Sequence, residues 1–487
     1  MPSAAPWRLR VATCGTVSRV TDGSRVDDRG GRLSQSAALL LLGLIVFLTR
    51  LPFLRGDAGL GRDNDAWRLY FAGKILIDNK QYVTSRPPGY PAMELISATF
   101  AALDAPLIAY TTATAAVSAA AAVAFAHLLQ SLHVKNWALV AVGFATTSVF
   151  FVHSTTFMDY TWSVAAFAVT LALLARNRLV AAGSAFGVAI ALRPATFIMV
   201  VAVVVVVAMS SSDNRRSDLL KFSIPVVGVS TAFYCLPLLS FGWAIVRVGG
   251  GSTSLREAIA RSTVDVWGPL GAVAIALALT RVLWRSVAAR GFPNGAHRRW
   301  ALGAAVGIVV QFVLFLALPE DSGYLLPGVL LIWLLLALTT PYPIMALVAA
   351  AVAVSSLVVP TRTSSFGAVL ADAKFRRAEV QCSLSLLHAM ERLPSGTIVV
   401  TRGFMYQVLA HEPQVKFAGV TPTDSFRSDV VPGEAELSSG QVLVYDLSSE
   451  IKNSKHVYRL NGVEANLPVL KANQDPFQLN HLRPECS

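Results

Sequence analysis

Long apolar runs are the feature that most constrains this chain of 487 residues. They follow one another from residue 37 to residue 360 with only short polar breaks, and 54% of the chain is hydrophobic while 14% is charged. Soluble domains carry roughly a quarter charged residues, and ~20 apolar residues in a row are enough for a helix to cross a bilayer. The chain is therefore predicted to be an α-helical polytopic membrane protein.

About 11 spans are expected from these runs. The first is Ala37–Thr49, which ends near Arg50, and the others are 106–130, 136–152, 161–176, 179–192, 194–210, 220–241, 266–285, 300–318, 323–340 and 341–360. Residues 92–103 are apolar but too short to cross, so we expect a juxtamembrane helix at the interface. If they crossed, the basic loops that follow would face outward, against the positive-inside rule.

This topology divides the chain into three parts. Residues 1–35 form a basic cytoplasmic tail, residues 36–360 a transmembrane domain with an outer loop at 50–91, and residues 361–487 a small extracytoplasmic α/β domain. In the last part we predict strands at 396–401, 414–420 and 442–445 and helices at 384–392 and 405–410. Cys382 and Cys486 lie there, either paired or as two free thiols. The richness in Ala and Val favours a bacterial inner membrane.

The formal net charge of +12 does not indicate nucleic-acid binding. The basic residues are spread over short loops between apolar runs, which is the pattern of topology signals and of contacts with anionic membrane lipids. A nucleic-acid interface would gather them on one patch.

Asp63 and Asp65 begin the most informative stretch, because carboxylates beside a membrane are costly unless they face water or act in chemistry. They directly precede an amphipathic run. An Asp-x-Asp pair here could supply a general base or share in binding a divalent cation, Mg²⁺ or Mn²⁺. The alternative is a solvated turn or a helix cap.

Arg86 precedes Pro87-Pro88-Gly89-Tyr90-Pro91. The two prolines hold the backbone extended at the membrane surface, and the guanidinium offers a rigid fork of donors that suits a phosphate. The alternative is an interfacial arginine that snorkels to water. Arg193, before Pro194, is equally consistent with two roles. It could be a phosphate ligand, or it could mark the polar break between two apolar spans.

Further polar residues stand at the outer ends of other spans. They are His153, Asp159, Tyr160, Glu320, Asp321 and Tyr324. Asp159 suits either a site or a helix N-cap, His153 could act as acid or base, and Glu320 and Asp321 could form a solvated turn. The predicted topology places all of these on the same outer face as Asp65, which is where a membrane active site would lie.

In combination, these motifs resemble the GT-C class of membrane glycosyltransferases, in particular the protein O-mannosyltransferases and aminoarabinose-to-lipid A transferases. The matching features are the Asp-x-Asp loop after the first span, the basic residue before PPGYP, the acidic residue of the second outer loop, and the run GYLLPG at 323–328. In the family an arginine usually stands where this chain has Ser322-Gly323.

The resemblance implies that a sugar, a hexose or a pentose, is transferred with inversion from a polyprenyl-phosphate donor to a glycan, lipid or protein acceptor. It makes Asp65 or Asp63 the catalytic base and Asp159 a second acidic residue of the site. Arg86 and, more weakly, Arg193 would contact the donor phosphate, and a divalent cation is optional.

Two other classes of function remain open at this point. A lipid-sugar flippase or transporter would show ionisable residues or broken helices near the middle of its spans, and the span interiors here are nearly free of charge. A non-catalytic membrane scaffold would tolerate loss of Asp65 and Asp159.

Overall fold

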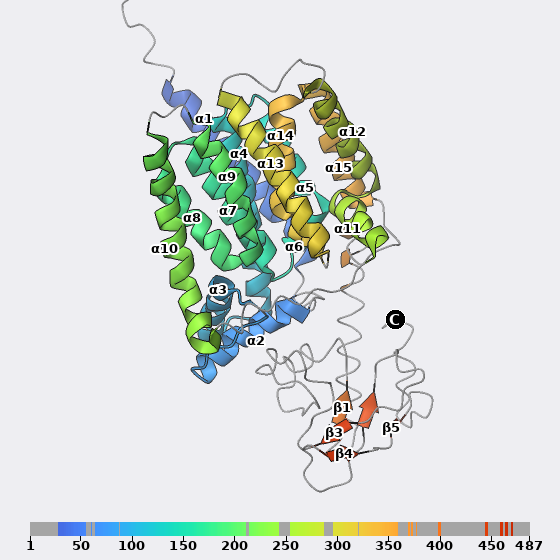
Figure 1. Ribbon diagram of the computed structural model, residues 1–487. Helices are drawn as coiled ribbons and strands as arrows, with labels where there is room; N and C mark the ends of the chain where they lie inside the picture. Colours follow the sequence, from blue (N-terminus) through green and yellow to red (C-terminus); the bar gives the residue numbers. More distant parts are fainter. Residues whose placement is uncertain are drawn as a thin grey trace, which may run out of the picture.

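The computed structural model describes residues 28–54, 60, 64–86, 88–210, 214–242, 254–286, 296–319 and 321–358, pieces of 369–376, and five short strands beyond. Helices packed side by side make up the main body (Figure 1). The first half contains α1 (Asp28–Arg50), η1 (Leu51–Phe53), α2 (Asn64–Asp78), α3 (Pro91–Ala102), α4 (Leu107–Ser131), α5 (Trp137–Thr146), α6 (Ser148–His153), α7 (Asp159–Ala175) and α8 (Leu179–Leu192). The second half contains η3 (Pro194–Met199), α9 (Val200–Ala208), α10 (Arg215–Phe241), α11 (Leu255–Trp267), α12 (Pro269–Arg285), α13 (Ala296–Ala317), η6 (Ser322–Leu325), α14 (Leu326–Thr339) and α15 (Tyr342–Val358).

Five of the described helices are long and apolar enough to cross a membrane, and α11 with α12, bent by 96°, would make a sixth. Shorter apolar helices of 10–17 residues accompany them at 137–146, 159–175, 179–192, 194–208 and 342–357. Each predicted apolar run overlaps one of these segments. The chain is a polytopic membrane protein, and the count of 11 spans stays a prediction because several of the helices are short.

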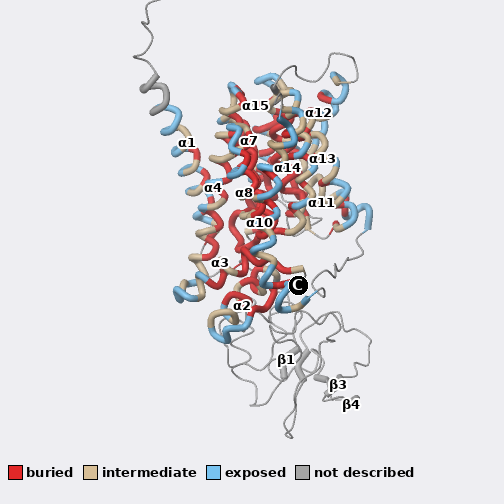
Figure 2. Tube along the Cα trace, turned by 60° about the vertical axis from the view of Figure 1, so that its left-hand side comes forward, coloured by how far each residue is buried: buried red, intermediate tan, exposed pale blue. Residues whose placement is uncertain are grey.

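The distribution of buried and exposed residues is that of a helix bundle surrounded by lipid. The residues of α7, α8 and α14 are mostly buried, while α1 exposes one side (Figure 2). Leu40, Leu44 and Leu48 of α1 are exposed large apolar side chains, as expected for a surface that faces acyl chains. Small residues let the helices approach closely: a Cβ on Gly143 would lie 2.4 Å from the Trp333 ring.

The predicted span 136–152 is two helices rather than one. The chain breaks at Thr147, which has an extended ψ of 130° and separates α5 from α6. The Thr147 hydroxyl donates to the carbonyl of Gly143 and accepts from Trp333 Nε1 at 3.1 Å. Hydroxyl side chains that bond the local backbone compete with helix continuation, and α6 is thereby turned toward the end of the bundle where the polar residues gather.

α2 and α3 lie against each other at one end of the bundle, opposite the end where α1 begins (Figure 1). α3 has 12 residues with proline at its first position and is not among the helices of spanning length. Its approach to α2 is close, because a Cβ on Gly73 would lie 2.5 Å from Ser97. The helix expected at 92–103 is therefore present, and its position beside the membrane stays a prediction.

The described C-terminal strands form two small sheets. β1 (Ile398–Val400), β2 (Val444–Asp446) and β5 (Val469–Leu470) pair in parallel in the order β1-β2-β5. β3 (Tyr458–Leu460) and β4 (Val463–Ala465) pair antiparallel. β1 falls within the predicted strand 396–401 and β2 overlaps 442–445. The strand predicted at 414–420, the helices at 384–392 and 405–410, and Cys382 and Cys486 lie outside the described residues, so the α/β domain stays a prediction.

Candidate active site

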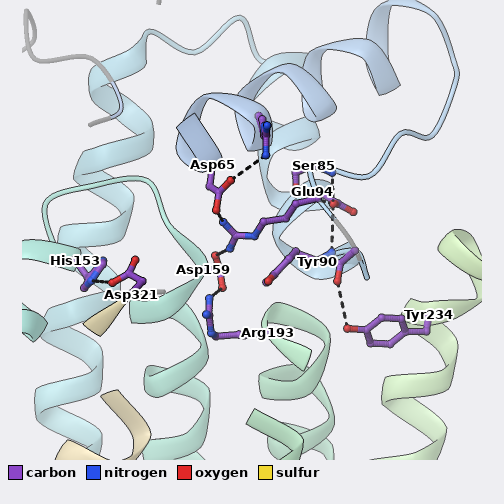
Figure 3. A network of polar contacts seen from close by, with 12 residues as sticks. Asp65, Ser85, Tyr90, Glu94, His153, Asp159, Arg193, Tyr234 and Asp321 are labelled. Carbon is purple, nitrogen blue, oxygen red and sulfur yellow. Dashed lines mark hydrogen bonds and ion pairs between the residues drawn. The ribbon is translucent and has the colours of Figure 1, made fainter. Parts of the chain in front are cut away.

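Four charged side chains from distant parts of the chain meet where α2, α7 and α8 come together (Figure 3). Asp65 belongs to the first turn of α2, Asp159 is the first residue of α7, and Arg193 directly follows α8. Arg86 comes from the loop between α2 and α3. The structure thus brings together residues that the sequence placed in three separate outer segments, with Asp65 and Arg86 in the same loop.

Asp159 is the centre of this cluster. Its side chain is 0% exposed, and its two oxygens accept from different arginines, Oδ1 from Arg86 and Oδ2 from Arg193. It does not act as a helix N-cap, because Met158 holds that position and no side-chain cap bond is made. Asp159 is therefore a bridge between two guanidinium groups.

Asp65 is the carboxylate of the cluster that reaches solvent, with 29% of its side chain exposed. Its Oδ2 accepts from Arg86, and its Oδ1 accepts from Arg68 at 3.4 Å. Asp65 is thus held by two arginines rather than solvated in a free turn. Part of its side chain is still accessible to an incoming molecule. Asp63 lies outside the described residues.

Arg86 and Arg193 are both buried, so neither snorkels to water. The Arg86 guanidinium stands 4.0 Å from the centre of the Tyr90 ring, and that of Arg193 stands 3.7 Å and 4.2 Å from the rings of Tyr160 and Tyr324. Burial by itself lowers the pKa of Arg86, but Asp159 and Asp65 outweigh it and raise that pKa well above its ordinary value. The guanidinium of Arg86 therefore stays charged.

Each of these two arginines has one guanidinium nitrogen that bonds no acceptor among the described residues. Arg86 Nε and Arg193 Nη2 are buried and have no hydrogen-bond partner among the described residues. Buried polar groups are nearly always paired, since leaving one unpaired costs about 1–3 kcal/mol. Two unpaired donors on neighbouring guanidinium groups suit the oxygens of an anionic ligand.

A second polar group lies beside the first. His153 Nε2 is 3.5 Å from Asp321 Oδ1, which also accepts the Gly323 backbone N–H at 2.8 Å. Burial would raise the pKa of Asp321, but His153, the Gly323 N–H and Tyr160 outweigh it and hold that pKa well below its usual range. Asp321 is thus not a freely solvated turn residue. Glu320 lies outside the described residues.

The lack of a side chain at Gly323 leaves room for His153 and Tyr160 in this second polar group. A Cβ at this position would lie 2.7 Å from His153 Nε2 and 2.8 Å from the Tyr160 ring. The imidazole and the tyrosine ring therefore occupy the room that a side chain would need. The rings of His153 and Tyr160 lie 4.5 Å apart and are tilted by 46°, and the Tyr160 ring also contacts the Arg193 guanidinium, so Tyr160 lies between the two polar groups.

Sequence reasoning missed three residues that support the site. Glu94, in the first turn of α3, is buried and accepts hydrogen bonds from the chain around Arg86. Arg50 Nε donates to Ser154 Oγ at 3.0 Å, and Arg376 Nη2 donates to Thr155 Oγ1 at 2.9 Å, so both anchor the turn that leads to Asp159. A carboxylate within an apolar helix was the available signal for Glu94. Arg50 stands at the end of the first span and Arg376 in the polar segment after the last span, and arginine is ordinary in both places.

The described residues do not form a metal site. No group of three or more His, Cys, Asp or Glu side chains gathers in the part of the chain that the structure describes. Both oxygens of Asp65 face guanidinium groups, which would repel a cation. A divalent cation, expected as optional, therefore stays a prediction that rests on Asp63.

No protein-family model and no curated protein matches this chain. Among solved structures it is similar to ArnT from Cupriavidus metallidurans bound to undecaprenyl phosphate, with a TM-score of 0.57 and 12% identity over 81% of this chain and 87% of that chain. The same protein in the apo state gives a TM-score of 0.46 and 15% identity over 74% of this chain and 71% of that chain.

At this identity the likeness to the ligand-bound structure concerns the fold. The chain has a GT-C-like membrane fold. This confirms the helical polytopic architecture expected from the sequence, and it leaves the chemistry of the site to be argued from the residues themselves.

Proposed function

We propose that this protein transfers a sugar from a polyprenyl-phosphate donor to an acceptor on the extracytoplasmic face of the membrane. The observation that carries the proposal is the pair of buried arginines with unpaired donors, Arg86 Nε and Arg193 Nη2, beside one exposed carboxylate, Asp65. The similarity in fold to a protein that binds undecaprenyl phosphate supports a lipid-linked phosphate as the anion.

The lipid phosphate would bind to Arg86 and Arg193. Asp159 holds the two guanidinium groups at a fixed separation, and the Tyr90, Tyr160 and Tyr324 rings shield them from water, which strengthens their attraction for an anion. As the bond between the anomeric carbon and the phosphate oxygen breaks, negative charge grows on the leaving phosphate. Donors that are already in place stabilise that charge.

Asp65 would act as the general base. Of the two described carboxylates it is the one that an acceptor can reach, because Asp159 is fully enclosed by the arginines. Asp65 would take the proton of the acceptor hydroxyl while the oxygen attacks the anomeric carbon from the side opposite the phosphate. One such displacement inverts the configuration and releases the polyprenyl phosphate, and Asp65 then returns the proton to water.

Sugar transfer in membranes tests this function. Membranes that contain the wild type, Asp65→Asn or the control Asp78→Asn would receive a panel of labelled polyprenyl-phosphate hexoses and pentoses. Asp78 is a suitable control because its carboxylate lies on the same helix and is exposed. We expect transfer by the wild type and by Asp78→Asn, and a loss of about 100-fold or more in Asp65→Asn at equal expression.

The remaining outcomes separate the competing classes. Transfer that survives in Asp65→Asn would remove Asp65 from the chemistry while leaving the reaction class in place. Movement of a labelled lipid-sugar across the bilayer without transfer would favour a flippase. No transfer and no movement across the whole panel would favour a non-catalytic scaffold.

A further inference from the structure

Glu94 is a buried acid that the proposed reaction does not use. It is 1% exposed in the first turn of α3, and four donors converge on its carboxylate. Oε2 accepts from the Tyr82 hydroxyl, and Oε1 accepts from the Ser85 backbone N–H at 2.7 Å, the Ser85 hydroxyl at 2.8 Å and the Tyr90 N–H at 3.2 Å. An apolar residue there would leave two backbone N–H groups of the loop without these partners.

These donors lie on both sides of Arg86 in the chain. Ser85 directly precedes the arginine, and Tyr90 carries the ring over which the guanidinium stands. Between them the backbone turns tightly: the Gly89 N–H donates to the Arg86 carbonyl at 2.7 Å, and Gly89 has a φ of 99°. A single side chain thus fixes both ends of the turn that presents Arg86 (Figure 3).

The other side of this turn rests on α10. Tyr234 Oη lies 3.4 Å from the Gly89 carbonyl, and the Tyr82 and Phe241 rings are 6.3 Å apart. These contacts are longer than those to Glu94, and the hydroxyl of Tyr234 is shared with the Ile190 carbonyl at 3.5 Å. The short contacts that hold the turn therefore come from Glu94.

We propose that Glu94 is a positioning residue that holds residues 82–90, of which the structure describes all but Pro87, so that Arg86 is aimed at the donor phosphate. The identity of the ligand, a donor phosphate, rests on the proposed function. The positioning of Arg86 rests on the hydrogen bonds of Glu94. Glu94 itself touches no substrate and acts through Ser85 and Tyr90. Its charge is not required for this role: a glutamine can accept from Ser85 and Tyr90 through its carbonyl and donate to Tyr82 through its amide.

Two measurements on Glu94→Ala, Glu94→Gln and the exposed control Asp78→Ala test the proposal. The first is sugar transfer as a function of donor concentration. We expect Glu94→Ala to raise the donor KM about tenfold or more and also to lower kcat, because Arg86 stabilises the leaving phosphate, and both Glu94→Gln and Asp78→Ala to stay within about threefold of wild type. The second is amide hydrogen exchange of residues 82–90, which should accelerate in Glu94→Ala alone.

The two measurements separate this proposal from the proposed function. If wild type transfers sugar but Glu94→Ala has an unchanged KM and unchanged exchange, Glu94 does not position the turn. If wild type neither transfers sugar nor binds undecaprenyl phosphate, the function fails and hydrogen exchange alone decides whether Glu94 holds the turn. Should Glu94→Ala not fold, Tyr82→Phe removes one of the four bonds, and an unchanged donor KM and exchange in that variant would overturn the proposal.

Discussion

Replacing Asp159 with asparagine should destabilise the protein far more than neutralising an exposed aspartate. Asp159 is fully enclosed and bridges Arg86 and Arg193. An asparagine keeps one carbonyl oxygen for one arginine, but its amide N–H groups face the donors of the other. Breaking a buried ion pair by removing one partner costs about 3–5 kcal/mol, because a charge is left unpaired inside the protein.

The control is Asp78→Asn, at the end of α2. Asp78 is 54% exposed and its nearest ammonium, that of Lys74, is 3.9 Å away, so its loss should cost less than about 1 kcal/mol. Thermal unfolding of the purified proteins in one detergent would compare them. We expect the Tm of Asp159→Asn to fall by about 5–10 °C and that of Asp78→Asn by less than about 2 °C. Equal melting of the two variants would refute the bridging role of Asp159.

Three further variants test the surroundings of the cluster. Gly323→Ala should lower the Tm by several degrees, because its Cβ would press on the His153 imidazole. Asp321→Asn should lower the Tm at pH 7; since the pKa of Asp321 is depressed, its carboxylate stabilises the fold above about pH 4, and the difference from wild type should shrink as the pH falls toward 3. Arg376→Ala should cost about 3–5 kcal/mol, measured as a lower Tm, because it releases the Thr155 turn and leaves the buried Asp372 without its ion-pair partner.

Each of these has a result that would contradict it. Unchanged melting of Gly323→Ala would mean that His153 moves aside freely. A stability difference between Asp321→Asn and wild type that is the same at pH 7 and pH 3 would mean that the carboxylate is not ionised by its neighbours. A Tm of Arg376→Ala equal to wild type would mean that this arginine does not anchor the turn.

The helical architecture was predictable because apolar runs of span length leave the backbone few alternatives in lipid. The short helix α3 was predictable from the apolar run at 92–103, which is too short to cross a bilayer, whereas its position at the interface stays a prediction. The break at Thr147 was not predictable, because the residues of α5 and α6 form one apolar run in the sequence, and the hydroxyl at the break bonds Trp333, 186 residues further along the chain.

The convergence of the polar residues was predictable from the sequence, whereas the surroundings of each residue were not. Outer-end polar residues were expected to converge, and the structure brings Asp65, Arg86, Asp159 and Arg193 into contact. Which carboxylate is exposed and which is enclosed depends on tertiary packing, which no spacing in the sequence reveals. The same holds for Glu94, since its partners Ser85 and Tyr90 come to it only because the chain folds back at Gly89.

Direct binding of undecaprenyl phosphate tests the central claim, that Arg86 and Arg193 form a site for a lipid phosphate. The purified protein would be titrated with undecaprenyl phosphate and with undecaprenol, which lacks the phosphate, using wild type, Arg193→Lys and the exposed control Arg178→Lys. The account predicts binding of the phosphate and not of the alcohol, weakened about tenfold or more in Arg193→Lys alone, because lysine loses the forked donors. Equal binding of both lipids, or equal phosphate binding by all three proteins, would contradict it.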